Sequence, residues 1–137
     1  MPFGTVNILA VIASAIANFA LGFVWFTVIF RNPYLEGLGK TADALARGPS
    51  VLVASGMQLV GNFVMAYILA WLMQRTGQNT VAGGVWLGLV VWLGFVAAVI
   101  GPMYAYQAFP LKFFAISAGY PLVALLLMGT ILGAWKV

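Results

Sequence analysis

The sequence predicts an all-α integral membrane protein, an up-down bundle of four helices forming a single transmembrane domain over residues 1–137. The chain is 64% hydrophobic and only 6% charged, whereas soluble domains are about 25% charged. Four runs of at least twenty residues contain no Lys, Arg, Asp or Glu, and about 20 apolar residues cross a bilayer as a helix. These runs do not alternate with period two, which excludes a β-barrel.

The first helix is expected over residues 5–30, and the polar residues at 31–33 close it. A polar connection follows over residues 31–49, the only sizeable polar part of the chain. Within it, Thr41 can cap a short helix through Arg47, because a threonine hydroxyl accepts a bond from a first-turn amide. We expect this short helix to lie at the membrane interface.

The remaining helices are expected over residues 50–73, 81–104 and 111–135. A tight turn around Gly77 joins the second helix to the third, and Pro110 opens the fourth. Such short connections make successive helices antiparallel.

Lysine and arginine set the orientation of a membrane protein, because cytoplasmic loops carry an excess of them. Four basic residues fall on one face and two on the other, which predicts that the first face is cytoplasmic. Both termini are then on the non-cytoplasmic side. The first face receives Arg31, Lys40, Arg47 and Lys112, and the second receives Arg75 and Lys136.

Residues 56–70 and 119–133 align without a gap and share six identities in fifteen positions. This similarity between the second and fourth helices suggests two repeated helical hairpins related by an axis along the membrane normal. The alternative is that Leu, Gly and Met recur by composition, and the alignment leaves both possibilities open.

Small residues spaced one turn apart favour close packing of membrane helices. They are Gly84 and Gly88 in the third helix, Gly129 and Gly133 in the fourth, and Gly22 in the first. They could form an oligomer interface or pack helices inside one bundle, which is the commoner use of this pattern.

Polar side chains inside the spans gather on the first two helices. Asn18 and Asn62 lie near the middle of antiparallel neighbours, so a hydrogen bond between them is predicted. Gln58, Ser55 and Ser14 lie on the same side, and we call these five residues the polar seam. Two interpretations follow: mutually bonded side chains that fix helix register, or a functional site that binds a ligand or forms a narrow permeation path. The absence of any charge favours the first.

Pro121 lies inside the fourth helix and has no amide hydrogen to donate to the carbonyl of Ser117. The sequence therefore predicts a kink at Pro121 and a carbonyl that needs another donor.

Catalysis is not expected, because the chain has no Cys and no His and its only carboxylates are Glu36 and Asp43. Nucleophilic, acid–base and metal chemistry all draw on these side chains. We therefore expect no metal site and no cofactor. A nucleic-acid partner is not expected either, since no soluble face carries a basic stripe.

Three of the expected helices carry aromatic and glycine motifs in a fixed order. They are Phe19, Gly22, Trp25, Phe26 and Phe30, then Gly84, Gly88 and Trp92 to Phe95, then Pro110 to Lys112, Phe114, Ile116, Gly119, Tyr120, Met128, Gly129, Ile131 to Gly133 and Trp135. These motifs resemble the small bacterial membrane proteins grouped as domain-of-unknown-function family 1761. The likeness spans most of the chain and is strongest in its second half, while Pro121 and the second helix depart from it. The resemblance implies a four-helix protein of the bacterial inner membrane and transfers no mechanism.

The leading functional hypothesis is a non-catalytic bundle that acts by helix packing, as a homo-oligomer or as an accessory subunit of a larger membrane complex. A passive channel or carrier for a small neutral or apolar solute, lined by Asn18, Gln58 and Asn62, is the first alternative. The second is a lipid- or quinone-binding membrane protein with headgroup contacts at Arg31, Arg47 or Lys112. Membrane lipids are partners in every case.

Overall fold

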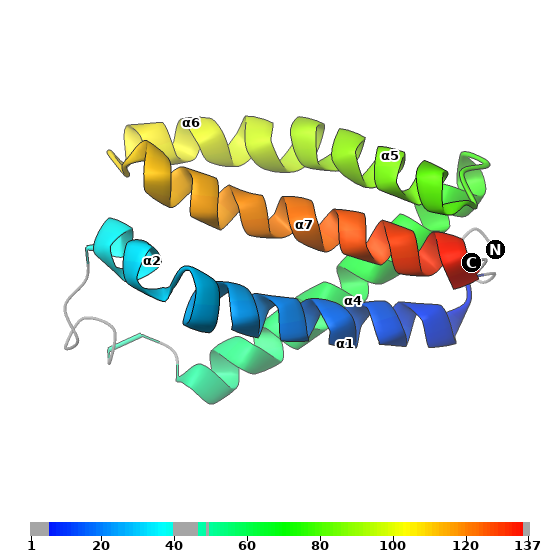
Figure 1. Cartoon of the computed structure of the whole chain (residues 1–137), viewed down its shortest axis with the longest axis horizontal. Coiled ribbons are helices and arrows are strands. Elements are labelled where there is room, and N and C mark those ends of the chain that lie inside the picture. The colour runs from blue at the N-terminus through cyan, green and yellow to red at the C-terminus, as the bar shows by residue number, and fades with distance from the viewer. Residues whose placement is uncertain (1–5, 40–46, 49, 136–137) are drawn as a thin grey trace.

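The computed structural model describes residues 6–39, 47–48 and 50–135, and every regular element in this part of the chain is a helix. Four helical stretches are long and apolar enough to cross a membrane, and successive ones run in opposite directions (Figure 1). The predicted fold class is confirmed. The four spans are Ile8–Ile29, Leu52–Arg75, Val81–Tyr106 and Leu111–Trp135.

The first span comprises helix α1 (Ile8–Val24) and a π-helical segment, η1 (Trp25–Ile29). Asn7 begins it by accepting a hydrogen bond from the amide of Ala10. The π segment was not predicted, because a wider helical turn has no signature in hydropathy.

The polar connection contains a helix that the sequence did not predict, α2 (Arg31–Leu38). Pro33 lies in its first turn, where the missing amide hydrogen costs no helical bond, and Gly39 ends it in a left-handed conformation (φ 68°). The first span does end before residues 31–33, as predicted, but these residues also begin a second helix. The short helix expected from Thr41 lies outside the described residues up to position 46, and Arg47 itself is in a turn.

The second span lies within α4 (Val51–Arg75), and Ser50 caps the first turn of this helix. The predicted turn follows, with Gly77 at φ 73°. The third span combines α5 (Val81–Val91), the π-helical η2 (Trp92–Ala97) and α6 (Ala98–Tyr106), and the fourth is α7 (Leu111–Trp135). The second and third spans end at Arg75 and Tyr106, slightly beyond the predicted residues 73 and 104.

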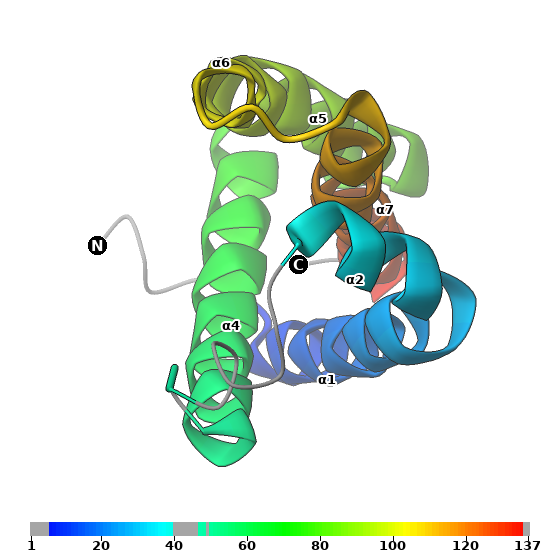
Figure 2. The same ribbon diagram turned by 90° about the vertical axis from the view of Figure 1, so that its left-hand side faces the viewer.

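Seen from one end, the four spans form a ring in the order α4, α1, α7 and α5, and α5 lies next to α4 again (Figure 2). α5 packs along α7, α1 contacts both α4 and α7, and α4 crosses its neighbours obliquely. The buried core lies at the end where α1 begins and α7 ends. It consists of Val6, Ala10, Val11, Ala66, Leu69, Ala70, Met73, Leu125, Met128 and Leu132.

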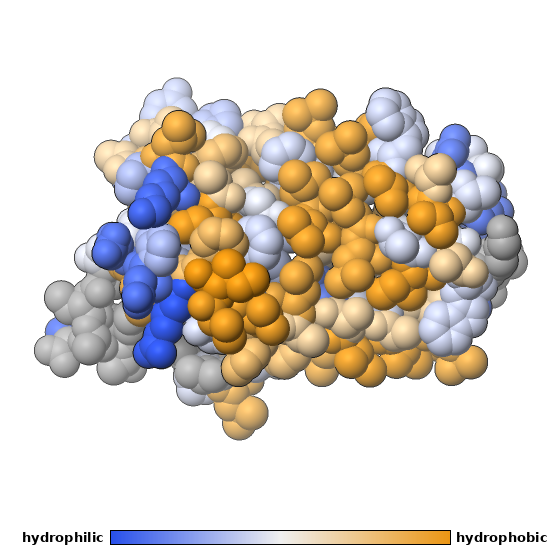
Figure 3. Space-filling view, in the orientation of Figure 1, coloured by the Kyte–Doolittle hydropathy of each residue, from blue (hydrophilic) through white to orange (hydrophobic). Residues whose placement is uncertain are grey.

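On the face seen in Figure 3, hydrophobic residues cover most of the middle, and the most hydrophilic residues gather at the end that carries α2. Arg31, Arg47 and Lys112 lie at this end and Arg75 at the other, while Lys40 and Lys136 fall outside the described residues. The grouping of these four basic residues follows the expected topology. Which end faces the cytoplasm stays a prediction.

α1 and α4 form one antiparallel hairpin, and α5 and α7 form a second in the same orientation (Figure 1). The first helix of each hairpin passes into a π segment at a tryptophan, Trp25 or Trp92. Internal duplication stays a prediction, and this shared feature adds to the similarity between the second and fourth helices.

Candidate functional site

The polar seam lies where α1 crosses α4. The side-chain amide of Asn18 donates to the side-chain oxygen of Asn62 at 2.8 Å, so the predicted hydrogen bond is present. Asn18 is 0% and Asn62 4% exposed. The bond therefore forms away from both water and lipid and fixes the register of the two helices.

A third helix takes part through Tyr120, which sequence reasoning missed. Its hydroxyl donates to the side-chain oxygen of Asn18 at 2.8 Å and accepts from the side-chain amide of Gln58 at 3.0 Å. The network thus joins α1, α4 and α7. The available signal was a tyrosine in the middle of a span, because a buried phenol usually has a hydrogen-bond partner.

Gly22 makes room for this network. A Cβ at Gly22 would lie 2.5 Å from the Gln58 amide nitrogen and 3.0 Å from the Tyr120 oxygen. A side chain at position 22 would therefore displace both groups.

The two serines of the seam stand apart from these bonds. Ser14 is fully buried, and its hydroxyl, like the Asn62 amide nitrogen, has no hydrogen-bond partner within the described residues. Ser55 is half-buried and joins none of the bonds above. Within the seam the one bond between two members is therefore that of Asn18 with Asn62, and Asn18 and Gln58 also bond the Tyr120 hydroxyl.

The glycines of α5 and α7 face each other. A Cβ at Gly84 would collide with the backbone of Gly129, and one at Gly88 would lie 2.9 Å from the Leu125 carbonyl oxygen. A Cβ at Gly133 would meet the Thr80 backbone. These residues pack two helices of one chain, which is the intramolecular use considered from the sequence.

Two tryptophans bond the backbone of α7 close to Pro121. The Trp25 indole donates to the Ile116 carbonyl at 3.0 Å, and the Trp92 indole donates to the Ala118 carbonyl at 2.8 Å. These two carbonyls lie on either side of the Ser117 carbonyl, which receives no helical hydrogen bond because Pro121 has no amide hydrogen. α7 continues through Pro121 as a single helix, and the kink stays a prediction.

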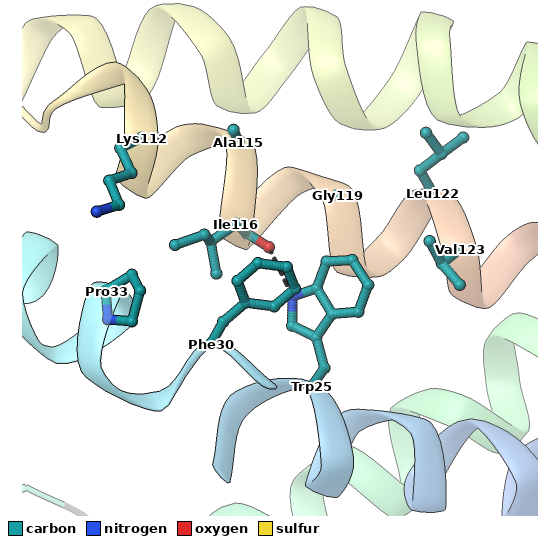
Figure 4. Close-up of a pocket in the computed structure, with 9 residues that line it drawn as sticks. All are labelled: Trp25, Phe30, Pro33, Lys112, Ala115, Ile116, Gly119, Leu122 and Val123. Carbon is teal, nitrogen blue, oxygen red and sulfur yellow. Dashed lines mark hydrogen bonds between the residues drawn. The ribbon is translucent and has the colours of Figure 1, made fainter. Parts of the chain in front are cut away.

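A groove of about 460 Å³ opens on the side of the bundle, between α7 and the end of the first span. Figure 4 shows Lys112 and Pro33 at one end of it, Trp25 and Phe30 along it, and residues 122–123 of α7 at the other end. We call this the lateral groove. Its lining residues are Trp25, Phe30, Pro33, Lys112, Ala115, Ile116, Gly119, Leu122 and Val123.

The lateral groove is almost entirely apolar. Among its lining side chains, only Lys112 is charged, and the only other polar group is the Trp25 indole, which already donates to Ile116. The ring centroids of Trp25 and Phe30 lie 4.7 Å apart. The groove can therefore hold a hydrocarbon chain along its length and an anion at one end.

α2 is held against the start of α7 by aromatic contacts. The rings of Tyr34 and Phe113 stack with their centroids 5.3 Å apart. Gly37 lies so close to the same ring that a Cβ added to it would be 2.7 Å from the Phe113 side chain. Burial raises the pKa of the Tyr34 phenol, and the nearby Tyr104 raises it further. Tyr34 is therefore neutral at physiological pH and brings no charge to this end of the protein.

The expected headgroup residues divide into two sets. All three are exposed at the same end of the protein, and of the three only Lys112 also lines the lateral groove. Lys112 is therefore the expected headgroup residue that has an adjoining apolar cavity.

Comparison with protein-family models finds a match to a family described as a protein of unknown function (DUF1761), over residues 9–133. Comparisons with curated proteins and with solved structures found no match. The resemblance drawn from the sequence motifs is confirmed, and the chain belongs to the DUF1761 family.

Proposed function

We propose that this four-span protein binds a phospholipid, with an acyl chain in the lateral groove and the headgroup phosphate at Lys112. The observation that carries the proposal is that the lateral groove has a cation at one end and apolar walls along the rest of its length. Its one cation lies in the first turn of α7, and the rest of its length is apolar. The start of a helix favours an anion as well, because its amide dipoles point outward there.

The length of the groove fits one leaflet. Lys112 and Val123 are eleven residues apart on α7, which corresponds to about 16 Å at ~1.5 Å per residue. Half of a hydrocarbon core is about 15 Å thick. A lipid standing at the interface would therefore place its chain along the groove as far as the middle of the membrane.

The same geometry favours a lipid over a quinone. A quinone ring carries two carbonyl oxygens, and a carbonyl in an apolar site loses free energy unless it meets a donor. The Trp25 indole, the only donor along the groove apart from Lys112, is already bonded to Ile116. An acyl chain needs no donor.

The test is lipid binding by the delipidated full-length protein, followed by native mass spectrometry. Lys112→Met should weaken phospholipid binding about fivefold, the result of losing ~1 kcal/mol of charge-assisted bonding. Ala115→Leu should weaken it by filling the groove. Arg47→Met, which removes a charge at the same end, and Ala134→Leu, which adds the same atoms at the other end of α7, are the controls. Equal binding by all four variants would refute the proposal.

Assembly into a homo-oligomer or a larger complex is the second candidate. The glycines of α5 and α7 are used inside the chain, but Gly56 and Gly61 of α4 lie on its exposed side with nothing within 4 Å of their Cβ positions. Close approach of another helix is possible there. Gly56→Leu and Gly61→Leu should abolish any dimer seen by cross-linking in mild detergent, and a wild-type protein that is strictly monomeric excludes this candidate.

The channel or carrier alternative has less support. Its proposed lining residues Asn18, Gln58 and Asn62 are bonded to one another or to Tyr120. A permeating solute would have to break these bonds. Flux through proteoliposomes that Asn62→Leu removes while the fold stays intact would restore this alternative.

A further inference from the structure

A smaller cavity of about 150 Å³ adjoins the lateral groove at the α2 end. The two cavities share Pro33 and Lys112, and the smaller one adds the side chain of Glu36. We call it the headgroup pocket. Its lining residues are Pro33, Glu36, Gly37, Pro110, Lys112 and Phe113.

The pocket presents opposite charges from two helices, Glu36 from α2 and Lys112 from α7. Neither side chain forms an ion pair with another described residue. The contact of Gly37 with Phe113 and the stacking of Tyr34 on Phe113 hold α2 in place against α7. The two charged side chains therefore line one small cavity, and the packing of α2 on α7 keeps their helices close together.

From this arrangement we infer that the bound lipid carries a zwitterionic headgroup with a primary ammonium, of the phosphoethanolamine type. This inference rests on the proposed function and extends it to the headgroup. The phosphate binds Lys112, the ammonium donates to the Glu36 carboxylate, and the short linker between them lies in the headgroup pocket. A trimethylammonium group has no N–H to donate to the carboxylate, and its three methyl groups make it bulkier than a primary ammonium in the small headgroup pocket. A glycerol headgroup offers no cation to the carboxylate, which forms no ion pair with the described residues.

Phosphatidylethanolamine and phosphatidylcholine with the same acyl chains provide the comparison, since both are zwitterionic with no net charge. The wild-type protein, delipidated and titrated by native mass spectrometry, should bind phosphatidylethanolamine about two- to fivefold more tightly, the effect of one exposed charged pair. Glu36→Gln should remove this preference. Gln107→Lys, which adds the same unit of charge at the same end and leaves Glu36 in place, should retain it.

Equal binding of the two lipids by the wild-type protein, or an unchanged preference in Glu36→Gln, overturns the inference. Loss of the preference in Gln107→Lys also overturns it, because overall charge would then be the cause. Lys112→Met and Ala115→Leu are measured in parallel. If they weaken both lipids while Glu36→Gln leaves the preference unchanged, only the headgroup inference fails, and if they weaken neither, the lipid-binding function fails.

Discussion

The side-chain amide of Asn18 donates to the side-chain oxygen of Asn62 across 2.8 Å, and the bond joins two antiparallel spans near their midpoints. Both residues are buried. Water cannot replace a lost partner at this depth, so the bond ties the register of α1 to that of α4. The Tyr120 hydroxyl, which donates to the Asn18 side-chain oxygen, links α7 to the same pair of helices.

A double-mutant cycle should measure this bond directly. Asn18→Leu and Asn62→Leu each remove one partner, and interhelical hydrogen bonds in membranes contribute about 0.6–2 kcal/mol. We expect a coupling free energy of about that size in unfolding from detergent micelles. Additive effects of the two substitutions would show that the contact contributes nothing to stability.

Tyr120→Phe should lower the free energy of unfolding by about 1–2 kcal/mol, because it leaves the bonding groups of Gln58 and Asn18 without their shared partner. The matched control is Tyr106→Phe, since Tyr106 is 93% exposed at the end of α6. Thermal unfolding in detergent should separate the two variants. Equal midpoints would argue against a stabilising network around Tyr120.

Gly84→Ala should destabilise the protein by about 1–3 kcal/mol, the usual cost of overpacking. The added Cβ would collide with the backbone of Gly129, which cannot move away as a side-chain end can. Gly94→Ala is the control, since nothing lies within 4 Å of its Cβ position. Wild-type stability of Gly84→Ala would contradict the close approach of α5 and α7.

Trp92→Phe should cost about 1 kcal/mol or more, because it removes the indole donor to the Ala118 carbonyl beside Pro121. Trp86→Phe makes the same substitution in the same span and should have little effect, because Trp86 is 59% exposed. Hydrogen exchange at the amides of α7 around Pro121 provides a second measurement. Faster exchange is expected in Trp92→Phe alone.

Ala108 occupies the turn between α6 and α7 with φ 59°, a left-handed conformation that costs a non-glycine residue about 1–2 kcal/mol. Ala108→Gly should therefore raise the midpoint of thermal unfolding, although the greater freedom of glycine in the unfolded chain offsets part of the gain. Ala105→Gly, inside α6, should lower it. A decrease in both variants would contradict the strained turn.

Much of the fold could be predicted because it depends on local properties. Each span needs only an uncharged run of sufficient length, and the caps at Ser50 and Thr80 need only a hydroxyl before the first turn. The bond between Asn18 and Asn62 was also predictable, since antiparallel neighbours bring their midpoints to the same depth.

The lateral groove and the place of Tyr120 could not be predicted in the same way. Lipid and protein interior are both apolar, so hydropathy does not distinguish the face of a span that points inward from the face that points outward. The rotation of α7 decides that Tyr120 meets Asn18 and that Lys112 borders a groove. The π segments at Trp25 and Trp92 change the rotation of the first and third spans beyond them, which hydropathy does not show either.

The sequence by itself determined that the chain crosses the membrane four times and that the polar residues of the spans could bond across two of them. The tertiary structure alone decided which glycines meet inside the chain, which helices share Tyr120, and that α2 lies against α7 beside a groove. The reason is physical: crossing a bilayer is a property of one segment and its solvent, whereas a site between helices depends on their rotation, tilt and lateral contacts.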